Sequence, residues 1–370
     1  MKLAWKELLR RPGRFAVAGV ILTLIAILLM FLGGLLDGLI ASSTGALRAQ
    51  QGDRIVYSDT SKDSLTRSRI EPEVRSEVEK AVGDGAVGGL GSVQLGARLP
   101  DRGPRDLVPV VLFGYELAPE GLPAEPPPPG KVYADTSLKA EGVTKGMVMK
   151  LGPARTEVTV IGFTSDSQYS GQGTLWGSLD TWRTVVDANR PDAAVGDDVV
   201  QALVVRDATS APATSAAIDE ATDGATHTLT IDQAINALPG VSQQQATFNQ
   251  IIGVTVVIAI VVVALFFALL TVERTGLYGV LKAIGASSGS LFAGVVLQAV
   301  VVTLCASALG ASAALLLDAV IPAGTIPFVA LPARLISSVL YLLVASVVGC
   351  AFSLRRVLKI DPASAIGGSL

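Results

Sequence analysis

Four long apolar runs divide this chain of 370 residues. The stretches without any charged residue are 15–36, 247–272, 283–317 and 335–354. A helix that crosses about 30 Å of hydrocarbon needs about 20 predominantly apolar residues, and each run is that long. The alternative is four buried helices in a soluble core, but a chain of this size cannot cover a core that large. The pattern therefore predicts four transmembrane helices.

The first apolar run follows a basic N-terminus, as the core of a signal peptide would. It is longer than the roughly 7–15 apolar residues of such a core, so we interpret it as a retained span. Before it, Lys2, Lys6 and Arg10 repeat every four residues, with Trp5 on the other face, and Pro12 follows. This spacing predicts an amphipathic elbow helix on the inner membrane surface. A basic N-terminus that only sets the topology is the alternative.

The polar segment between the first two runs predicts a mixed α+β domain. Segments rich in β-branched residues predict strands at 55–57, 108–113, 158–161 and 199–205. Helices are predicted at 72–82 and 214–221, and residues 231–248 are compatible with a helical lead-in to the second span. The proline-rich stretch 123–130 predicts a turn or rigid linker, with a subdomain boundary as an open alternative.

The predicted fold class is a membrane protein with four transmembrane α-helices, arranged one plus three, and one large α+β domain between spans one and two. The predicted boundaries are 1–14 for the elbow helix, 15–48 for the first span and stalk, 49–230 for the α+β domain, 231–272 for the stalk and second span, 273–287 for a coupling helix, 288–318 for the third span, 319–334 for an external loop, 335–354 for the fourth span and 355–370 for the tail.

Basic residues predict the orientation, because Lys and Arg in short loops mark the cytoplasmic side. The N-terminus, the segment between spans two and three and the tail are basic, whereas the loop between spans three and four has Arg334 alone. Both termini are therefore expected in the cytoplasm of a multi-pass protein of the cell membrane, with residues 49–230 outside. Residues 41–246 carry 27 acidic and 18 basic side chains, a net charge of −9.

Composition excludes several classes of function. A net charge of −3 argues against a nucleic-acid partner. Cys305 and Cys350 both lie in apolar runs, which excludes a disulfide scaffold, and a single histidine, His227, argues against a metal site. The chain has no glycine-rich loop ending in Gly-Lys-Ser or Gly-Lys-Thr, the motif that binds ATP in P-loop proteins. We therefore expect no catalytic residues and no cofactor in this chain.

The charged segment between spans two and three has the order of an amphipathic helix. Leu277, Val280, Leu281 and Ile284 follow a spacing of three and four residues and form one apolar stripe. Gly285 is suited to end this helix in a left-handed conformation, and Ser287 or Ser288 to cap the next. The segment predicts a sharp corner between two helices. The simpler alternative is that Glu273 and Arg274 only end the second span.

The same segment resembles a known family. Residues 273–287 are similar to the ERxxEiGvLrAiGas signature of FtsX/MacB-type ABC transporter permeases, and residues 355–365 are similar to their C-terminal ending, with Asp361-Pro362 at its centre. The elbow, the external domain and the arrangement of spans match in architecture. The chain departs from the signature at Leu277, where the family usually has Glu, and at Tyr278, usually Ile.

The resemblance implies a non-catalytic permease subunit of an exporter. A separate ATPase, in two copies, would hold ATP and magnesium, and its motion would reach a homodimer of this chain by mechanotransmission. An accessory extracytoplasmic protein is a further implied partner. The implied residues of ATPase coupling are Glu273, Arg274, Leu277, Tyr278, Leu281, Lys282, Gly285, Ala286, Asp361 and Pro362.

Within that family, the segment 31–39 resembles the DevC/HrtB-like branch, whose members export glycolipid or haem. The implied substrate is hydrophobic: a lipid, a glycolipid or haem. Candidate contacts are Met30, Phe31 and Gln298, although packing is the simpler role for Met30 and a helix–helix hydrogen bond for Gln298. A different function stays open, a signalling adaptor that relays ATPase motion to an external partner such as a cell-wall hydrolase.

Overall fold

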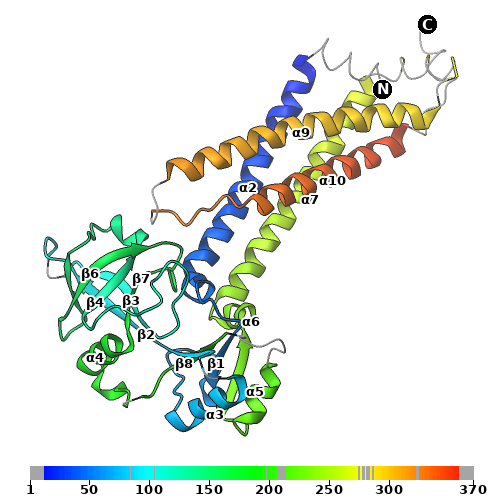
Figure 1. Ribbon diagram of the computed structural model, residues 1–370. Coiled ribbons are helices and arrows are strands. Elements are labelled where there is room, and N and C mark those ends of the chain that lie inside the picture. Colours follow the sequence, from blue (N-terminus) through cyan, green and yellow to red (C-terminus); the bar gives the residue numbers. More distant parts are fainter. Residues whose placement is uncertain are drawn as a thin grey trace. The chain divides into compact units, whose positions relative to one another are not determined.

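The computed structural model describes residues 12–83, 85–103, 105–196, 198–206, 214–273, 276, 280, 284–285, 287–321 and 325–357 (Figure 1). The chain divides into two compact units. One contains the chain up to Asp37 together with Gln245–Ile321 and Phe328–Leu370, and the other contains Gly38–Gln244 and Pro322–Pro327. The predicted elbow helix lies outside the described residues, apart from its last three positions.

The first unit is built from four long helices. They are α2 (Pro12–Arg48), α7 (Val241–Glu273), α9 (Ser288–Val320) and α10 (Pro332–Val357), of which α2 and α7 continue into the second unit. All four are long and apolar enough to cross a membrane. Pro12 stands at the start of α2, where its missing N–H leaves no helical hydrogen bond unmade. The four predicted spans are confirmed.

Small residues bring these helices close together. A Cβ on Gly310 of α9 would lie 2.8 Å from the Cβ of Ala26 of α2, and one on Gly349 of α10 would lie 2.8 Å from the carbonyl oxygen of Ile260 of α7. One core cluster draws on all four helices, including Phe15, Phe267, Ala306 and Cys350. Backbone-to-backbone contact of this kind holds helices together where lipid removes the hydrophobic driving force. Ala306, Gly310 and Ala314, which recur every four residues along α9, therefore form a packing surface.

The second unit contains a mixed sheet of nine strands in the order β3-β7-β4-β6-β5-β2-β8-β1-β9. The strands are β1 (Arg54–Ser58), β2 (Val87–Arg98), β3 (Val108–Tyr115), β4 (Lys131–Asp135), β5 (Val148–Leu151), β6 (Thr156–Thr164), β7 (Gly173–Ser178), β8 (Ala202–Val205) and β9 (Thr226–Thr230). The long strand β2 pairs with β3, β5 and β8 in turn. Because β2 also pairs with β3, six strands close into a hydrogen-bonded ring, and β8, β1 and β9 extend from it.

Both faces of this sheet are covered. Along β3, Val110 and Leu112 belong to one core cluster, whereas Val111, Phe113 and Tyr115 belong to a second. This alternation follows from the two-residue period of a strand. The first cluster includes residues of α3 (Pro72–Val82), α4 (Leu179–Asn189) and α5 (Ser215–Ala221); the second includes residues of α6 (Ile231–Ala237) and the last turns of α2. The predicted α+β domain is confirmed.

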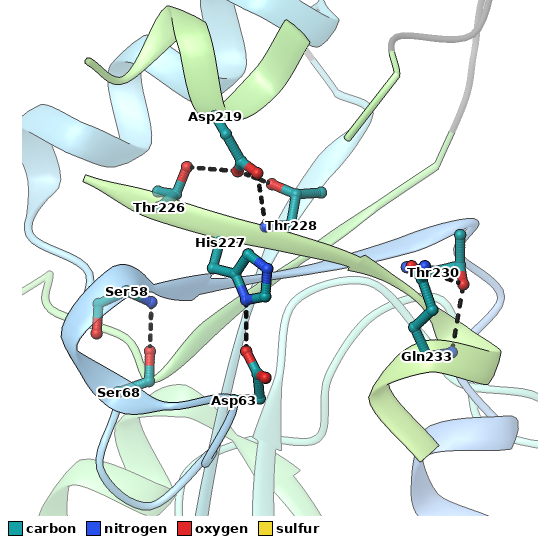
Figure 2. Close-up of polar contacts among 9 residues, drawn as sticks. All are labelled: Ser58, Asp63, Ser68, Asp219, Thr226, His227, Thr228, Thr230 and Gln233. Carbon is teal, nitrogen blue, oxygen red and sulfur yellow. Dashed lines mark hydrogen bonds and ion pairs between the residues drawn. The ribbon is translucent and has the colours of Figure 1, made fainter. Parts of the chain in front are cut away.

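Hydrogen bonds of side chains fix the edge strand β9 and the loop that follows β1 (Figure 2). The carboxylate of Asp219 accepts from the hydroxyl of Thr228 at 2.6 Å and from that of Thr226 at 3.1 Å. On the neighbouring β9 residue, Nδ1 of His227 lies 2.6 Å from Oδ1 of Asp63 in the loop. Thr230 and Gln233 form a reciprocal capping box that starts α6. The edge of the sheet and the loop are therefore tied to each other.

The structure decides one open alternative in this unit and refines one prediction. The proline-rich stretch 123–130 connects β3 to β4 within one sheet, so it is not a subdomain boundary. Residues 231–248 are not one continuous lead-in helix. The chain leaves the helical conformation at Leu238, and Gly240, with φ of +86°, precedes α7. Glycine adopts this left-handed conformation without the steric cost that a side chain imposes.

Candidate functional site

The segment between α7 and α9 contains the predicted corner. Gly276 and Val280 are helical, and the amide of Ile284 donates to the carbonyl oxygen of Val280 at 3.1 Å. Gly285 then has φ of +98°, as predicted for a left-handed helix end. Ser287 caps the next helix, because its side chain accepts a hydrogen bond from the amide of Ser290 at 3.2 Å. Both predicted end signals are confirmed.

The corner exposes apolar side chains. Ile284 is 77 % exposed and Val280 is 54 % exposed, and both belong to the predicted apolar stripe. The acidic side chain of Glu273, at the end of α7, is exposed as well. Exposed apolar surface next to charge is typical of a surface that another protein covers. The predicted coupling residues Arg274, Leu277, Tyr278, Leu281, Lys282, Ala286, Asp361 and Pro362 lie outside the described residues.

The three candidate substrate contacts do not form one site. Met30 on α2 is 1 % exposed and belongs to a cluster with Ala314 and Phe328, and Phe31 stacks on Phe328 with ring centroids 5.6 Å apart. Gln298 is buried on α9, sixteen residues before Ala314. That separation corresponds to about 24 Å along a helix axis. Met30 therefore packs within the bundle, far along α9 from Gln298.

A partly buried ion pair that sequence reasoning missed joins α2 to α10. Nε and Nη2 of Arg334 donate to the two carboxylate oxygens of Asp37 at 2.8 and 2.6 Å. The Asp37 side chain is 10 % exposed and that of Arg334 is 27 % exposed. Gly33 leaves room for the guanidinium, because a Cβ there would lie 2.8 Å from Cδ of Arg334. Two parallel hydrogen bonds make this the strongest geometry for such a pair.

The chain segment before α10 is fastened at the same place. The amide of Val329 donates to the carbonyl oxygen of Gly34 at 3.1 Å, and that of Ala330 donates to a carboxylate oxygen of Asp318 at 3.2 Å. A signal for this contact was in the sequence: Asp37 directly follows the first charge-free run, and Arg334 directly precedes the last. Opposite charges at the ends of two spans tend to pair.

Some known proteins resemble this chain along its whole length, and others only over a stretch of about 115 residues. Residues 249–362 match the family described as FtsX-like permease C-terminal. A Staphylococcus haemolyticus protein named "Putative hemin transport system permease protein HrtB" is 22 % identical, covering 100 % of this chain and 99 % of its own length. An uncharacterized ABC transporter permease of Mycobacterium tuberculosis is 44 % identical over 116 residues, which is 30 % of this chain and 31 % of that protein.

The chain carries an FtsX-like permease domain. That domain contains most of α7, the corner and all of α9 and α10. The chain thus combines an FtsX-like permease domain with four candidate membrane spans. Permeases of this type are typically non-catalytic and associate with an ATPase subunit. Among the described residues, no cluster of three His, Cys, Asp or Glu side chains could hold a metal ion.

The ion pair between Asp37 and Arg334 can be measured in this FtsX-like permease with a double-mutant cycle. Asp37→Ala or Arg334→Ala leaves one charge unpaired and mostly buried, so each should lower the unfolding free energy by about 3 kcal/mol. The double variant should lose much less unfolding free energy than the sum of the losses of the two single variants. Thermal unfolding of the full chain in dodecyl maltoside, followed by circular dichroism, measures all three.

A matched control is the exposed ion pair of Lys150 and Glu157, whose side chains are 50 % and 61 % exposed. Its alanine cycle should give a coupling below about 1 kcal/mol, as exposed pairs do. Additive losses for Asp37→Ala and Arg334→Ala would contradict the assignment of a coupled pair.

Proposed function

We propose that this chain is the permease subunit of an ABC exporter that extrudes a hydrophobic substrate from the membrane. A separate ATPase would supply the energy, and two copies of each chain would form the transporter. The single observation that carries the proposal is the exposed apolar corner at Val280 and Ile284, within the FtsX-like domain. A chain without a nucleotide-binding motif needs a surface through which ATP-driven motion can enter it.

The corner is suited to receive that motion, because in the proposed topology the corner and both termini lie in the cytoplasm. A bound ATPase can shift a permease between two states only if its contacts differ between them. Apolar side chains that are more than half exposed supply such contact area. The left-handed turn at Gly285 and the cap at Ser287 hold those side chains on a defined corner, so a push there acts on two helices at once.

Transmission would use α2 and α7. These helices contain 37 and 33 residues without interruption, which is about 55 and 50 Å at 1.5 Å per residue. Both exceed the hydrocarbon thickness of about 30 Å, so each extends beyond the lipid. Each also exposes an apolar stripe, with Val17, Val20 and Leu24 on α2 and Val254, Val261 and Leu265 on α7. A second copy of the chain, lipid or a hydrophobic substrate could cover these stripes.

The substrate class is supported by the relatives that align along the whole chain. Three staphylococcal proteins, at 21 to 22 % identity and with 99 % of their own length covered, are named for hemin transport. We therefore propose haem, or a lipid of similar hydrophobicity, as the molecule to be extruded. Full-length alignment with transport proteins favours export over a relay to an external hydrolase, because the external domain is included in it.

The coupling surface predicts one clear mutational result. Val280→Asp and Ile284→Asp each place a charge on the apolar corner, and each should reduce permease-stimulated ATP hydrolysis at least tenfold, because the partner can no longer bury that surface. The measurement is the ATPase rate of the co-purified complex. Leu107→Asp is the control, since Leu107 is 43 % exposed in the external domain and should leave the rate unchanged. Equal rates in all variants would contradict the coupling role.

The substrate proposal predicts a spectroscopic result. Hemin added to the full chain in lipid nanodiscs should shift its Soret absorbance in a saturable manner. Met30→Leu should leave that shift unchanged, because Met30 packs against Ala314 and Phe328 and has almost no accessible surface. If mass spectrometry instead finds a co-purifying lipid and hemin produces no saturable shift, the substrate is a lipid. If neither molecule binds, export of a hydrophobic substrate is contradicted.

A further inference from the structure

The external α+β domain contains a pocket of about 310 Å³ that no part of the permease mechanism uses. Its polar lining comes from three places: the loop before Ile70, strand β2 and its neighbour Gln201, and the C-terminal end of α4. The lining residues that matter here are Thr66, Arg69, Ser92, Gln94, Arg190 and Gln201. A cavity of this size lies at the lower end of the range for small-molecule sites.

Two arginines of the pocket lack an acidic partner. Nη1 of Arg69 donates to the carbonyl oxygens of Thr66 at 3.1 Å and Ser68 at 2.7 Å. Nη2 of Arg190 donates to the carbonyl oxygen of Gln94 at 3.2 Å. Within the described part of the chain, neither guanidinium has a carboxylate within ion-pair distance. Elsewhere in this acidic domain, Arg75 and Arg102 each pair with glutamate at 2.9 Å, whereas Arg98 and Arg206 donate to carbonyl oxygens.

The environment of Arg69 has an energetic cost. Burial lowers the pKa of Arg69, since removing water disfavours the charged form. No nearby carboxylate offsets this loss of hydration. Arginine nevertheless stays protonated at any physiological pH. The half-buried positive charge is therefore available to a ligand that brings its own negative charge.

A buried amide adds a third hydrogen-bond donor. Gln201 is 4 % exposed, and its Oε1 accepts from the amide of Ser92 at 2.6 Å and from the Ser92 hydroxyl at 3.2 Å. These bonds fix the orientation of the side chain, because only the oxygen can accept. Its Nε2 has no partner among the described residues, although the residue lines the pocket. A ligand oxygen in the pocket can therefore accept a hydrogen bond from Nε2 of Gln201.

The loop that carries Thr66 and Arg69 is held in position before any ligand arrives. The amide of Ser58 donates to Oγ of Ser68 at 2.8 Å, and the Asp63–His227 contact fixes the start of the loop (Figure 2). At its end, Ile70 forms a β-bridge with Val200, next to Gln201. Binding therefore does not have to order the loop, which removes one of the main entropic costs of association.

We propose that this pocket binds a small ligand through its carboxylate or phosphate group. Guanidinium groups match both oxyanions with two parallel hydrogen bonds, and the Nε2 donor of Gln201 adds a directional contact. The surrounding domain is acidic, with 27 acidic against 18 basic residues in 41–246, so the attraction for an anion comes from the arginines of the pocket and not from the net charge of the domain. The proposal is independent of what the permease exports.

The test uses the full chain in dodecyl maltoside, an uncharged detergent, at low chloride concentration. Isothermal titration with inorganic phosphate and, separately, with succinate should show saturable binding of at least one of them, and the difference identifies the preferred oxyanion. Arg69→Gln and Arg190→Gln should each weaken that binding at least tenfold. Arg67→Gln is the matched control, because Arg67 is an exposed arginine of the same loop outside the pocket and should leave the affinity unchanged.

A second variant separates loss of the site from loss of the fold. Gln201→Glu keeps the acceptor for Ser92 but replaces the free donor with a negative charge, so anion binding should disappear while the thermal unfolding temperature stays close to that of the parent chain. The proposal is overturned if neither anion binds below about 10 mM. It is equally overturned if Arg69→Gln and Arg190→Gln bind as the parent does, or if Arg67→Gln weakens binding as much as they do.

Discussion

In a lipid bilayer, every backbone N–H and C=O group must find its hydrogen bond inside the protein, and the architecture follows from that constraint. It favours helices that continue without interruption, as α2 and α7 do over 37 and 33 residues. It also means that a helix can end only where the backbone N–H and C=O groups of its last turn find hydrogen-bond partners outside the helical pattern. The corner after α7 meets this condition with a left-handed glycine at Gly285 and a capping hydroxyl at Ser287. The place where the hydrogen-bond ladder must stop is thus the place at which we propose that a partner protein acts.

The contacts inside the four-helix unit complement this arrangement. The helices approach closely at Gly310 and Gly349, where any side chain would collide with a neighbouring backbone. The forked ion pair of Asp37 and Arg334 and the hydrogen bond from Val329 to Gly34 fasten α2 to the start of α10. In contrast, Val280 and Ile284 at the corner remain exposed. A unit whose helices are packed and hydrogen-bonded together is suited to move as a body when force is applied at its exposed corner.

Local pattern was enough to predict much of this fold. The four spans followed from length and hydropathy, α3 followed from its periodicity and its N-terminal proline, and the ends at Gly285 and Ser287 followed from residue type. Strand β2 was missed because its sequence, VGGLGSVQLGAR, is rich in glycine and does not alternate. The ring of six strands was missed as well, because its pairings β3–β7 and β2–β5 join strands that are distant in sequence and leave no local signal.

The candidate functional sites also differ in whether they leave a local signal in the sequence. The corner could be predicted because its residues are neighbours in sequence. Asp37 and Arg334 are 297 positions apart, and only the packing of α2 against α10 brings them within 2.6 Å. The pocket of Arg69, Arg190 and Gln201 is likewise assembled from three distant segments. Sequence reasoning finds such residues as isolated polar side chains and cannot say which of them meet.

We propose that ATP-driven motion enters the permease at the corner between α7 and α9. Site-specific photo-crosslinking in living cells tests it most directly, with benzoylphenylalanine in place of Ile284 and, as a control, in place of Leu107. If motion enters at the corner, position 284 should give a light-dependent adduct between the permease and its ATPase subunit, and position 107 should give none. If position 284 gives no adduct with an ATPase, or if position 107 gives as much, the corner is not the coupling surface.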